Sequence, residues 1–425
     1  MIRTCGPIET CLRQDLRDGL RYSELSNRAA GARPMRVGIV TNEYPPFIFG
    51  GIGTFSQYLA EALAMIGVEV LVIAGSPEKY PTRVLEKHSL EIVRVPRGPF
   101  HPRYLWFQLR SRCLIERELK RCNVVHGQDT SAFPLLQLCK THMTGTRWFI
   151  TFHGNPRVEL HYALDGAFRG SSLTDITDNV LAFPLRDLMV RQHLDKADHI
   201  VCVSRALLED LRRDYSIEPA RTSVVPACVD IKALEALPRS LEPRSERVCL
   251  FFSGRLCYIK GVLRLSEIMR HLISHFRVTN FVLQVFGEGP LERRLRLDVA
   301  RYRLENHVKI LGFVTHHALI ANLKNSDIVC MPSFYEASPL GMIEAMALGK
   351  PIVAYDLPFA REILEDDCES LLASDDFDFA QKLAALISSA RDRTRLGANL
   401  KTKAARFDAI NVARSYRELY LNLTA

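Results

Sequence analysis

The sequence predicts an α/β protein built from two doubly wound domains. Strand-like apolar runs alternate with helical patterns over residues 35–234, and a second series of the same kind covers residues 248–404. Residues 235–247, between the two series, are rich in proline and charge, which is typical of a linker. A chain of 425 residues is also long for a single hydrophobic core, so we expect one domain from each series.

The composition is that of an ordinary globular protein, with 47% hydrophobic and 24% charged residues. The eleven cysteines form no CxxC pair, so we expect buried thiols in a reducing compartment. The sequence has neither an apolar run long enough to span a bilayer nor the apolar core of a signal peptide, and we expect a cytosolic protein. The net charge of +8 suits an anionic substrate or membrane surface, and without any recognition pattern for nucleic acid we expect no such partner.

The first series opens with a strand, a glycine-rich turn and a helix. The preceding residues 1–34 show no periodic pattern, and we expect either a weakly ordered extension or upstream sequence from a start codon placed too early. Gly50 and Gly51 lie in the turn, where the backbone can approach a phosphate or a substrate closely. A dinucleotide-binding fingerprint fits poorly, because its third glycine and the acidic residue for the ribose are both missing.

Two later features of the first series each allow two interpretations. Residues 103–121 predict a basic amphipathic helix, which either rests on a membrane surface or packs on its domain with a solvated face. A short apolar strand ends at His153, in the position where ligands bind in open α/β sheets. The alternative for His153 is a structural hydrogen bond at a strand end.

The second series places charged and aromatic side chains after successive strands. Arg255 and Lys260 follow the first strand and a glycine turn, where a guanidinium fork and a mobile ammonium suit a diphosphate. Solvated basic residues in a turn are the alternative. Glu288 follows the next strand, and Phe313 follows the one after it.

The stretch from Pro332 to Pro351 predicts a loop and a helix after a further strand. Ser338 suits the N-cap, Pro339 suits the first helical position, and Gly349 suits a stop after about ten residues. The unpaired amides at the positive end of such a helix form a natural seat for a phosphate.

Two carboxylates flank this helix start. Glu336 lies in the loop, and Glu344 lies about five residues into the helix, roughly 7 to 8 Å along its axis. That spacing suits a ligand with a hydroxylated ring at each end and phosphates between them, as in a nucleotide sugar; two solvated glutamates are the alternative. Because the carboxyl ends of parallel strands meet at one sheet edge, we expect these residues to gather with those after the neighbouring strands.

One acidic pattern is better explained without a ligand. Asp376 and Asp378 match the acid-x-acid arrangement that holds a divalent metal in many sugar transferases. They lie in a polar segment beside a helix start, where N-capping accounts for them. No metal site is predicted.

Together, the motifs resemble the large family 4 (group 1) of retaining glycosyltransferases. The resemblance runs from about Met35 to the C-terminus and is carried by Tyr44-Pro-Pro with Gly50-Gly51, Phe152-His153-Gly154, Ser253-Gly-Arg255 with Lys260-Gly261, Gly287-Glu288-Gly289, Leu311-Gly312-Phe313, and the E-x7-E pair Glu336 and Glu344. It implies the GT-B fold, two facing Rossmann-like domains with a C-terminal helix, residues 405–425, that crosses back onto the first domain.

The resemblance also implies roles for the motif residues. Arg255 and Lys260 would hold the donor diphosphate. Glu344 would accept hydrogen bonds from the ribose, and Glu336 would orient the transferred sugar. The other implied donor or catalytic contacts are Glu288, the base contact near Phe313, the loop residues Ser338, Pro339 and Leu340, and Gly50, Gly51 and His153 from the first domain.

The implied reaction moves a sugar from a nucleotide-diphosphate donor, such as UDP-glucose or GDP-mannose, to a glycan, lipid or other hydroxyl acceptor. It would proceed with retention and without a metal or cofactor. Acceptor choice is expected in first-domain loops that include residues 155–182. A sugar-nucleotide epimerase and a catalytically idle nucleotide-sugar-binding protein are the alternatives. We expect a cytoplasmic enzyme, held at the inner membrane face if the basic helix contacts anionic lipid.

Overall fold

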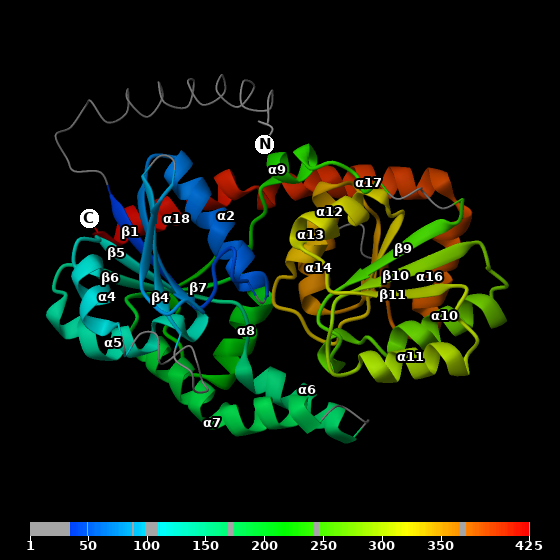
Figure 1. Cartoon of the computed structure of the whole chain (residues 1–425), viewed down its shortest axis with the longest axis horizontal. Helices are drawn as coiled ribbons and strands as arrows, with labels where there is room; N and C mark the ends of the chain where they lie inside the picture. The colour runs from blue at the N-terminus through cyan, green and yellow to red at the C-terminus, as the bar shows by residue number, and fades with distance from the viewer. Residues whose placement is uncertain are drawn as a thin grey trace. The chain divides into compact units, whose positions relative to one another are not determined.

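The chain divides into two compact units (Figure 1). Unit 1 comprises residues 1–150, 196–199 and 409–425, and unit 2 comprises residues 151–195 and 200–408. The computed structural model describes residues 35–48, 50–86, 89–97, 109, 111–168, 173–241, 246–365 and 371–424. The predicted N-terminal extension lies outside these residues.

The first sheet has eight strands in the order β3-β4-β2-β1-β5-β6-β7-β8. Strand β1 pairs in parallel with β2 and β5, and only the short edge strand β3 is antiparallel to its described partner, β4. The strand order reverses at β1, so the turn after β1 lies at a topological switch point, where α/β sheets bind ligands. The strands are β1 (Arg36–Thr41), β2 (Glu69–Ser76), β3 (Thr82–Leu85), β4 (Leu90–Pro96), β5 (Val124–Gln128), β6 (Arg147–Phe152), β7 (His199–Cys202) and β8 (Thr222–Val224).

The C-terminal helix completes the core of unit 1. Helix α18 packs on α2, and its residues Ala413, Tyr416 and Tyr420 are fully buried. The Tyr420 hydroxyl lies 2.7 Å from Nδ1 of the buried His126. The helices of this unit are α2 (Gly51–Met65), α4 (Arg112–Leu119), α5 (Phe133–Cys139) and α18 (Ala409–Thr424), with short 3-10 turns η1 (Asp129–Ala132) and η2 (Lys140–His142).

The second sheet has six strands in the order β11-β10-β9-β12-β13-β14, and each described pair is parallel. The chain runs outward from β9 to β11 on one side, and then from β12 to β14 on the other. The switch point of this sheet therefore lies between the carboxyl ends of β9 and β12. The strands are β9 (Val248–Ser253), β10 (Phe281–Phe286), β11 (Val308–Gly312), β12 (Ile328–Met331), β13 (Ile352–Tyr355) and β14 (Leu372–Ala373).

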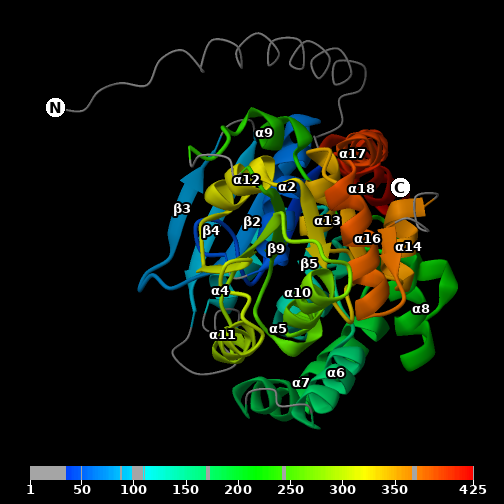
Figure 2. The same ribbon diagram turned by 90° about the vertical axis from the view of Figure 1, so that its right-hand side faces the viewer.

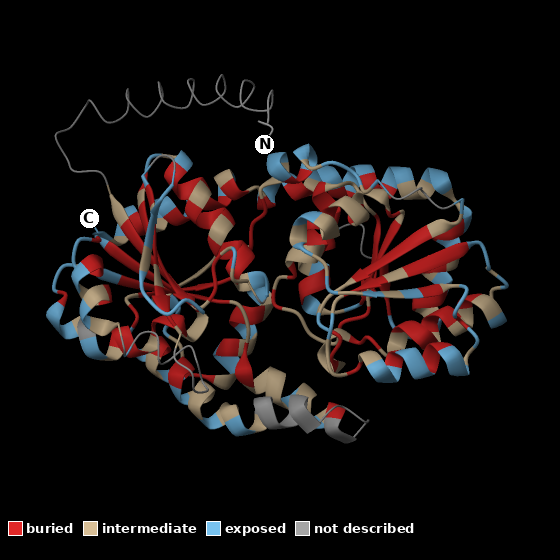
Figure 3. Ribbon diagram, viewed as in Figure 1, coloured by how far each residue is buried: buried red, intermediate tan, exposed pale blue. Residues whose placement is uncertain are grey.

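Helices flank this second sheet, and buried residues follow the strands of both sheets (Figure 3). Helices α10 and α16 lie side by side (Figure 2), and α13 packs on α17. The helices of unit 2 include α6 (Pro156–Phe168), α7 (Leu173–Lys196), α8 (Arg205–Asp214), α9 (Ile231–Ala236), α10 (Arg264–Ser274), α11 (Glu292–Arg301), α12 (His316–Asn325), α13 (Leu340–Ala347), α14 (Pro358–Leu364), α16 (Asp376–Ser388) and α17 (Ala390–Ala404), with 3-10 turns η3 (Pro219–Arg221), η4 (Tyr258–Lys260) and η6 (Ala405–Phe407).

Several local predictions need correction. The predicted helix over residues 103–121 is described only in part, as α4 and its flanking residues, because residues 98–108 and 110 lie outside the described residues. Residues 155–182, predicted as loops, contain all of α6 and the start of α7. Of the linker, residues 235 and 236 end α9, and residues 242–245 lie outside the described residues.

The predicted cap of α13 is also wrong. Pro339 is the N-cap, with an extended ψ of 115°, instead of Ser338, and the helix has eight residues instead of about ten. A proline lacks both a side-chain acceptor and a backbone N–H, so it offers this helix no capping hydrogen bond.

Candidate active site

The candidate site lies in unit 2, at the switch point of the second sheet. Backbone hydrogen bonds tie the turn after β9 to the turn after β10: Gly254 N donates to the Phe286 oxygen at 3.1 Å, and Leu256 N donates to the Glu288 oxygen at 2.9 Å. The approach is close enough that a Cβ on Gly287 would lie 2.0 Å from the Gly254 oxygen. Gly287 is therefore required by backbone packing.

A second close approach joins the turn that carries Lys260 to the loop after β12. Gly261 ends η4 with φ +62°, and a Cβ at this position would lie 1.7 Å from the Pro332 oxygen. Phe334 N donates to the Ile259 oxygen at 2.8 Å across the same contact. Both left-handed backbone and lack of space therefore require glycine here, and the contact fixes Lys260 beside the following loop.

This arrangement produces an ion pair between Lys260 and Glu336. The Lys260 ammonium lies 2.5 Å from Oε1 of Glu336, which also accepts from the Ser333 hydroxyl at 2.9 Å. The side chains are 30% and 11% exposed. Burial acts to lower the pKa of Lys260, but the Glu336 carboxylate outweighs it and holds that pKa above its usual value. Lys260 is thus charged at neutral pH.

A cavity of about 310 Å³ opens beside this ion pair. All four residues predicted to be catalytic line it, and they come from three segments: His153 after β6, Arg255 and Lys260 after β9, and Glu336 after β12. Burial lowers the pKa of the His153 imidazole to about 3, so this side chain is neutral at pH 7. These four side chains therefore combine two cations, one carboxylate and one neutral imidazole.

Helix α6 supplies a wall that the sequence does not predict. Glu159, Tyr162 and Ala163 line the cavity from this helix. Tyr162 stacks on Phe334 at a centroid distance of 6.0 Å, and Phe334 stacks in turn on Tyr258 at 4.9 Å. Helix α6 begins shortly after His153, in a segment predicted as a loop, so the sequence does not reveal this stack.

Glu344 has a partner that the sequence does not predict either. Its side chain is only 6% exposed on α13, and its Oε1 lies 2.7 Å from Nε2 of His316. Burial acts to lower the pKa of His316, but the hydrogen bond and charge of Glu344 outweigh it and raise that pKa above its usual value. His316 is the first residue of α12, in the turn after β11, so its place at the same sheet edge was the available signal.

The other predicted donor-binding residues of unit 2 lie outside the cavity lining. Glu288 is exposed and contributes its carbonyl oxygen to the turn described above. Phe313 is 70% exposed just after β11. Ser338, Pro339 and Leu340 lie at the start of α13, near the switch point.

Gly50 and Gly51 lie in unit 1, and their contacts are described within that unit. Gly51 is the first residue of α2, and Gly50 N donates to Oε2 of Glu43 at 2.9 Å. The Glu43 carboxylate thus lies at the glycine turn after β1. The sequence alone did not predict this contact.

The acid-x-acid pattern serves structural contacts. Asp375, the N-cap of α16, accepts from Asp378 N at 2.8 Å, so the capping interpretation is right but the capping residue is Asp375. Asp376 pairs with Arg264 at 2.6 Å. Within the described part of the chain, no three His, Cys, Asp or Glu side chains gather in a way that could hold a metal ion.

The two sheets, with polar side chains gathered at the switch point of the second, define a doubly wound α/β protein with a candidate ligand site. Comparison with known proteins identifies its family. Residues 235–403 match the family described as Glycosyl transferases group 1, and residues 49–233 match Glycosyltransferase Family 4. Together the two matches cover most of the chain, so it belongs to the group 1 (family 4) glycosyltransferases and is a transferase.

Individual relatives are distant. A phosphatidylinositol N-acetylglucosaminyltransferase subunit of Arabidopsis thaliana is 26% identical over 360 residues, which cover 83% of this chain and 74% of that protein. MMP alpha-(1->4)-mannosyltransferase of Mycolicibacterium hassiacum is 25% identical over 393 residues, which cover 84% of this chain and 90% of that protein.

Solved structures share the fold. Sucrose-phosphate synthase from Thermosynechococcus elongatus superposes with a TM-score of 0.73 at 20% identity, covering 92% of this chain and 99% of that one. Anabaena Alr3699/HepE in complex with UDP and glucose gives a TM-score of 0.68 at 17% identity, covering 91% of this chain and 100% of that one. The predicted GT-B fold is confirmed.

Proposed function

We propose that the chain is a retaining, metal-independent glycosyltransferase that moves a sugar from a nucleotide-diphosphate donor to a hydroxyl acceptor. The observation that carries this proposal is the cavity that Arg255, Lys260, Glu336 and His153 line together. UDP and glucose in the HepE complex support a nucleotide-sugar donor of this kind.

Arg255 and Lys260 act on the leaving group. Departure of a nucleoside diphosphate leaves an oxocarbenium-like sugar and increases the negative charge on the phosphate oxygens. Two fixed cations stabilise that charge more in the transition state than in the ground state, and this lowers the barrier. Because both cations are side chains of the protein, the reaction needs no divalent metal for this charge.

Glu336 orients the transferred sugar through its hydroxyl groups. Its Oε1 already accepts from both Lys260 and Ser333. An oxygen engaged by an ammonium and a hydroxyl is a poor nucleophile, so we assign no covalent sugar–enzyme intermediate to it. A phosphate oxygen of the departing group then receives the acceptor proton, and the acceptor attacks from the leaving-group side with retention.

His153 and Glu344 act at opposite ends of the donor. The neutral imidazole of His153 hydrogen-bonds a sugar hydroxyl without placing a positive charge beside the oxocarbenium-like carbon. Glu344 accepts from the ribose, with His316 orienting its carboxylate from the other side. The base extends toward Phe313, and the backbone N–H groups of Ser338 and Leu340 face the sugar or phosphates.

The acceptor is a glycan, a lipid or another molecule that offers a hydroxyl group. The names of the Mycolicibacterium and Arabidopsis relatives, a mannosyltransferase and part of a phosphatidylinositol glycosyltransferase, support this class without choosing within it. No helix among the described residues is both long and apolar enough to cross a bilayer. A cytoplasmic enzyme that meets its acceptor at the membrane surface is consistent with this class.

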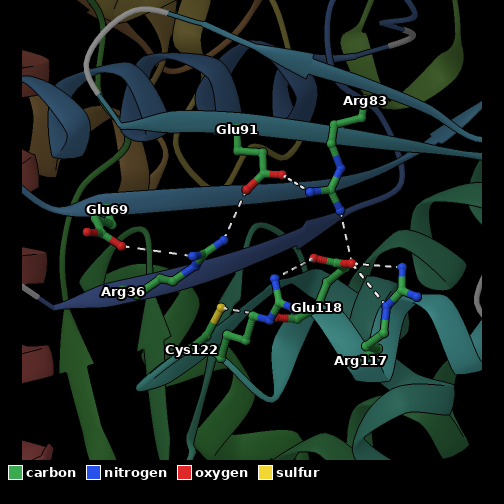
Figure 4. Close-up of polar contacts among 8 residues, drawn as sticks. Arg36, Glu69, Arg83, Glu91, Arg117, Glu118 and Cys122 are labelled. Carbon is green, nitrogen blue, oxygen red and sulfur yellow. Dashed lines mark hydrogen bonds and ion pairs between the residues drawn. The ribbon is translucent and has the colours of Figure 1, made fainter.

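Contact with an anionic membrane would involve α4. Residues 111–121 hold four basic and two acidic side chains, a surplus of two positive charges: Arg112, Arg117, Lys120 and Arg121 against Glu116 and Glu118. Figure 4 shows Glu118, only 2% exposed, between Arg83 at 2.9 Å and Arg117 at 3.2 Å. Much of the charge on α4 is therefore matched within unit 1. Sedimentation with phosphatidylserine vesicles, compared with phosphatidylcholine vesicles, tests the contact, and equal recovery from both would refute it.

The proposed activity is tested with UDP-glucose, UDP-N-acetylglucosamine and GDP-mannose, each with a lipid or oligosaccharide extract and excess EDTA. We expect one donor to yield a glycosylated product whose anomeric configuration, determined by NMR, matches the donor. Glu336→Gln should lower turnover strongly. A changed donor sugar without acceptor would indicate an epimerase, and donor binding without any product would indicate an idle binding protein.

A further inference from the structure

A second cavity of unit 2, about 440 Å³, adjoins the first. The two cavities share three wall residues: Tyr162, Tyr335 and Glu336. The rest of the described wall comes from α6, α8, Phe334 and the start of α14. Glu336 thus has the proposed donor cavity on one side and this second cavity on the other.

We propose that the second cavity is the acceptor subsite and that it takes an uncharged pyranoside, the sugar end of the acceptor. The inference rests on the proposed function. Transfer requires an acceptor hydroxyl within about 3 to 3.5 Å of the anomeric carbon, so the acceptor must occupy a space that meets the donor sugar. The wall at Glu336, which orients the donor sugar, is where the two spaces meet.

The aromatic walls suit a sugar ring. Tyr162 stacks on Phe334 at 6.0 Å and on Tyr335 at 6.3 Å, each with an interplanar angle of 24°. A pyranose ring has apolar C–H faces and a polar rim of hydroxyl groups. The parts of these half-buried rings that border the cavity can pack on the former, and the neighbouring carboxylates can accept hydrogen bonds from the latter.

The charges on the described walls favour a neutral ligand over a phosphate or a carboxylate. Arg213 lies 2.6 Å from Oδ1 of Asp210 and 3.5 Å from Oδ1 of Asp214. Arg157 lies 2.8 Å from Oδ1 of Asp187 and also donates to the Asp214 carbonyl oxygen. Both guanidinium groups are already paired, so an anionic ligand would have to displace a carboxylate.

The backbone N–H groups at the N-terminus of α8 are also already paired with a carboxylate. Arg205 N donates to the Glu362 carboxylate at 2.9 and 3.0 Å, and Ala206 N donates to it at 3.2 Å. This carboxylate from α14 satisfies the amides that would otherwise attract an anion.

The cavity is also preorganised. The fully buried Asn155 donates to Oδ2 of Asp214 at 2.7 Å and accepts from Arg157 N at 3.0 Å. The first bond joins the start of α6 to the end of α8, two helices that both line the cavity, and the second fixes the Asn155 side chain at the start of α6. A wall held in this way loses little entropy when a sugar binds.

The test places a bulky side chain in the second cavity by substituting Ala206, which lines this cavity and not the first. Ala206→Phe adds a ring to the second cavity, and Glu209→Phe adds the same ring to an exposed position of α8 outside the lining. Octyl glucopyranoside, galactopyranoside and mannopyranoside serve as acceptors, each beside its uronic acid counterpart. The donor is the nucleotide sugar that the proposed donor screen selects, and calorimetry measures donor affinity separately from transfer.

We expect transfer to at least one neutral glycoside and none to the uronic acids. Ala206→Phe should raise the acceptor KM about tenfold or more, because the added ring takes the space that the acceptor sugar would occupy. The donor Kd should stay unchanged. Glu209→Phe should match the wild-type protein. Donor binding shows that each variant is folded, and Ala206→Leu replaces Ala206→Phe, with the same expectation, if the larger substitution fails to fold.

Three results would overturn the inference: an unchanged acceptor KM in the Ala206 variant, a preference for uronic acids, or donor binding without transfer to any neutral glycoside. Absence of donor binding in the wild-type protein would instead refute the proposed function, and the inference with it.

Discussion

Removal of the ion pair between Lys260 and Glu336 should affect both stability and turnover. The perturbation is a cycle of Lys260→Met, Glu336→Gln and the double variant. At 2.5 Å and an effective dielectric constant of about 20, the attraction between the charges is about 7 kcal/mol before desolvation is subtracted. Contacting residues show net coupling free energies of about 0.5 to 3 kcal/mol. Because both groups are largely buried, we expect about 1 to 3 kcal/mol here.

Urea unfolding without donor measures the coupling, and kcat/KM measures the effect on the reaction. Loss of the Lys260 charge should lower kcat/KM by about 10²- to 10³-fold, as the loss of one preorganised donor to a transition-state anion does. Lys309→Met, at an exposed lysine of β11, is the matched control and should change little. Additivity within about 0.5 kcal/mol would show that the pair does not form. Equal kcat/KM in the two lysine variants would refute the assigned role.

Two further predictions concern the scaffold of the site. Gly261→Ala should lower the free energy of unfolding by about 2 to 4 kcal/mol, because it adds a clash with Pro332 to left-handed strain. Gly312→Ala is the control: at φ +75°, with open space around the added Cβ, it should cost only the strain. Equal losses of stability in urea unfolding would contradict the packing argument. The His316 pKa is raised by Glu344, so the stability lost in His316→Gln should be largest below about pH 6.5 and should shrink as the pH rises through the raised folded-state pKa. A pH-independent difference in urea unfolding would contradict this account.

The sequence contained enough to predict the fold and the positions of the loops at the sheet edge. Alternating strands and helices implied two doubly wound sheets, and the rule that ligands bind at carboxyl ends of strands placed His153, Lys260 and Glu336 in loops that the structure brings to one cavity. Parallel topology explains this success for Lys260 and Glu336, because every strand of the second sheet ends at the same edge. His153 follows β6 of the first sheet, so its place in the same cavity does not follow from that rule.

The details that depend on side-chain packing could not be predicted. The pairing of His316 with Glu344 joins residues 28 positions apart. The helical wall of the cavity around Tyr162 was hidden by a polar segment without clear periodicity. The prediction of the α13 N-cap failed. Ser338 has the residue type that is preferred at an N-cap, but the helix begins one residue later, with Pro339 as its N-cap. Propensity favours a cap without fixing the residue at which the backbone turns.

The most direct test of the central claim, that the cavity beside Lys260 is the donor site, is calorimetric titration with a nucleotide sugar. We predict that the wild-type chain binds one molecule of its donor, and that Lys260→Met weakens this binding at least about tenfold, which is about 1.4 kcal/mol. Equal donor affinity in the wild-type protein and Lys260→Met would contradict the claim.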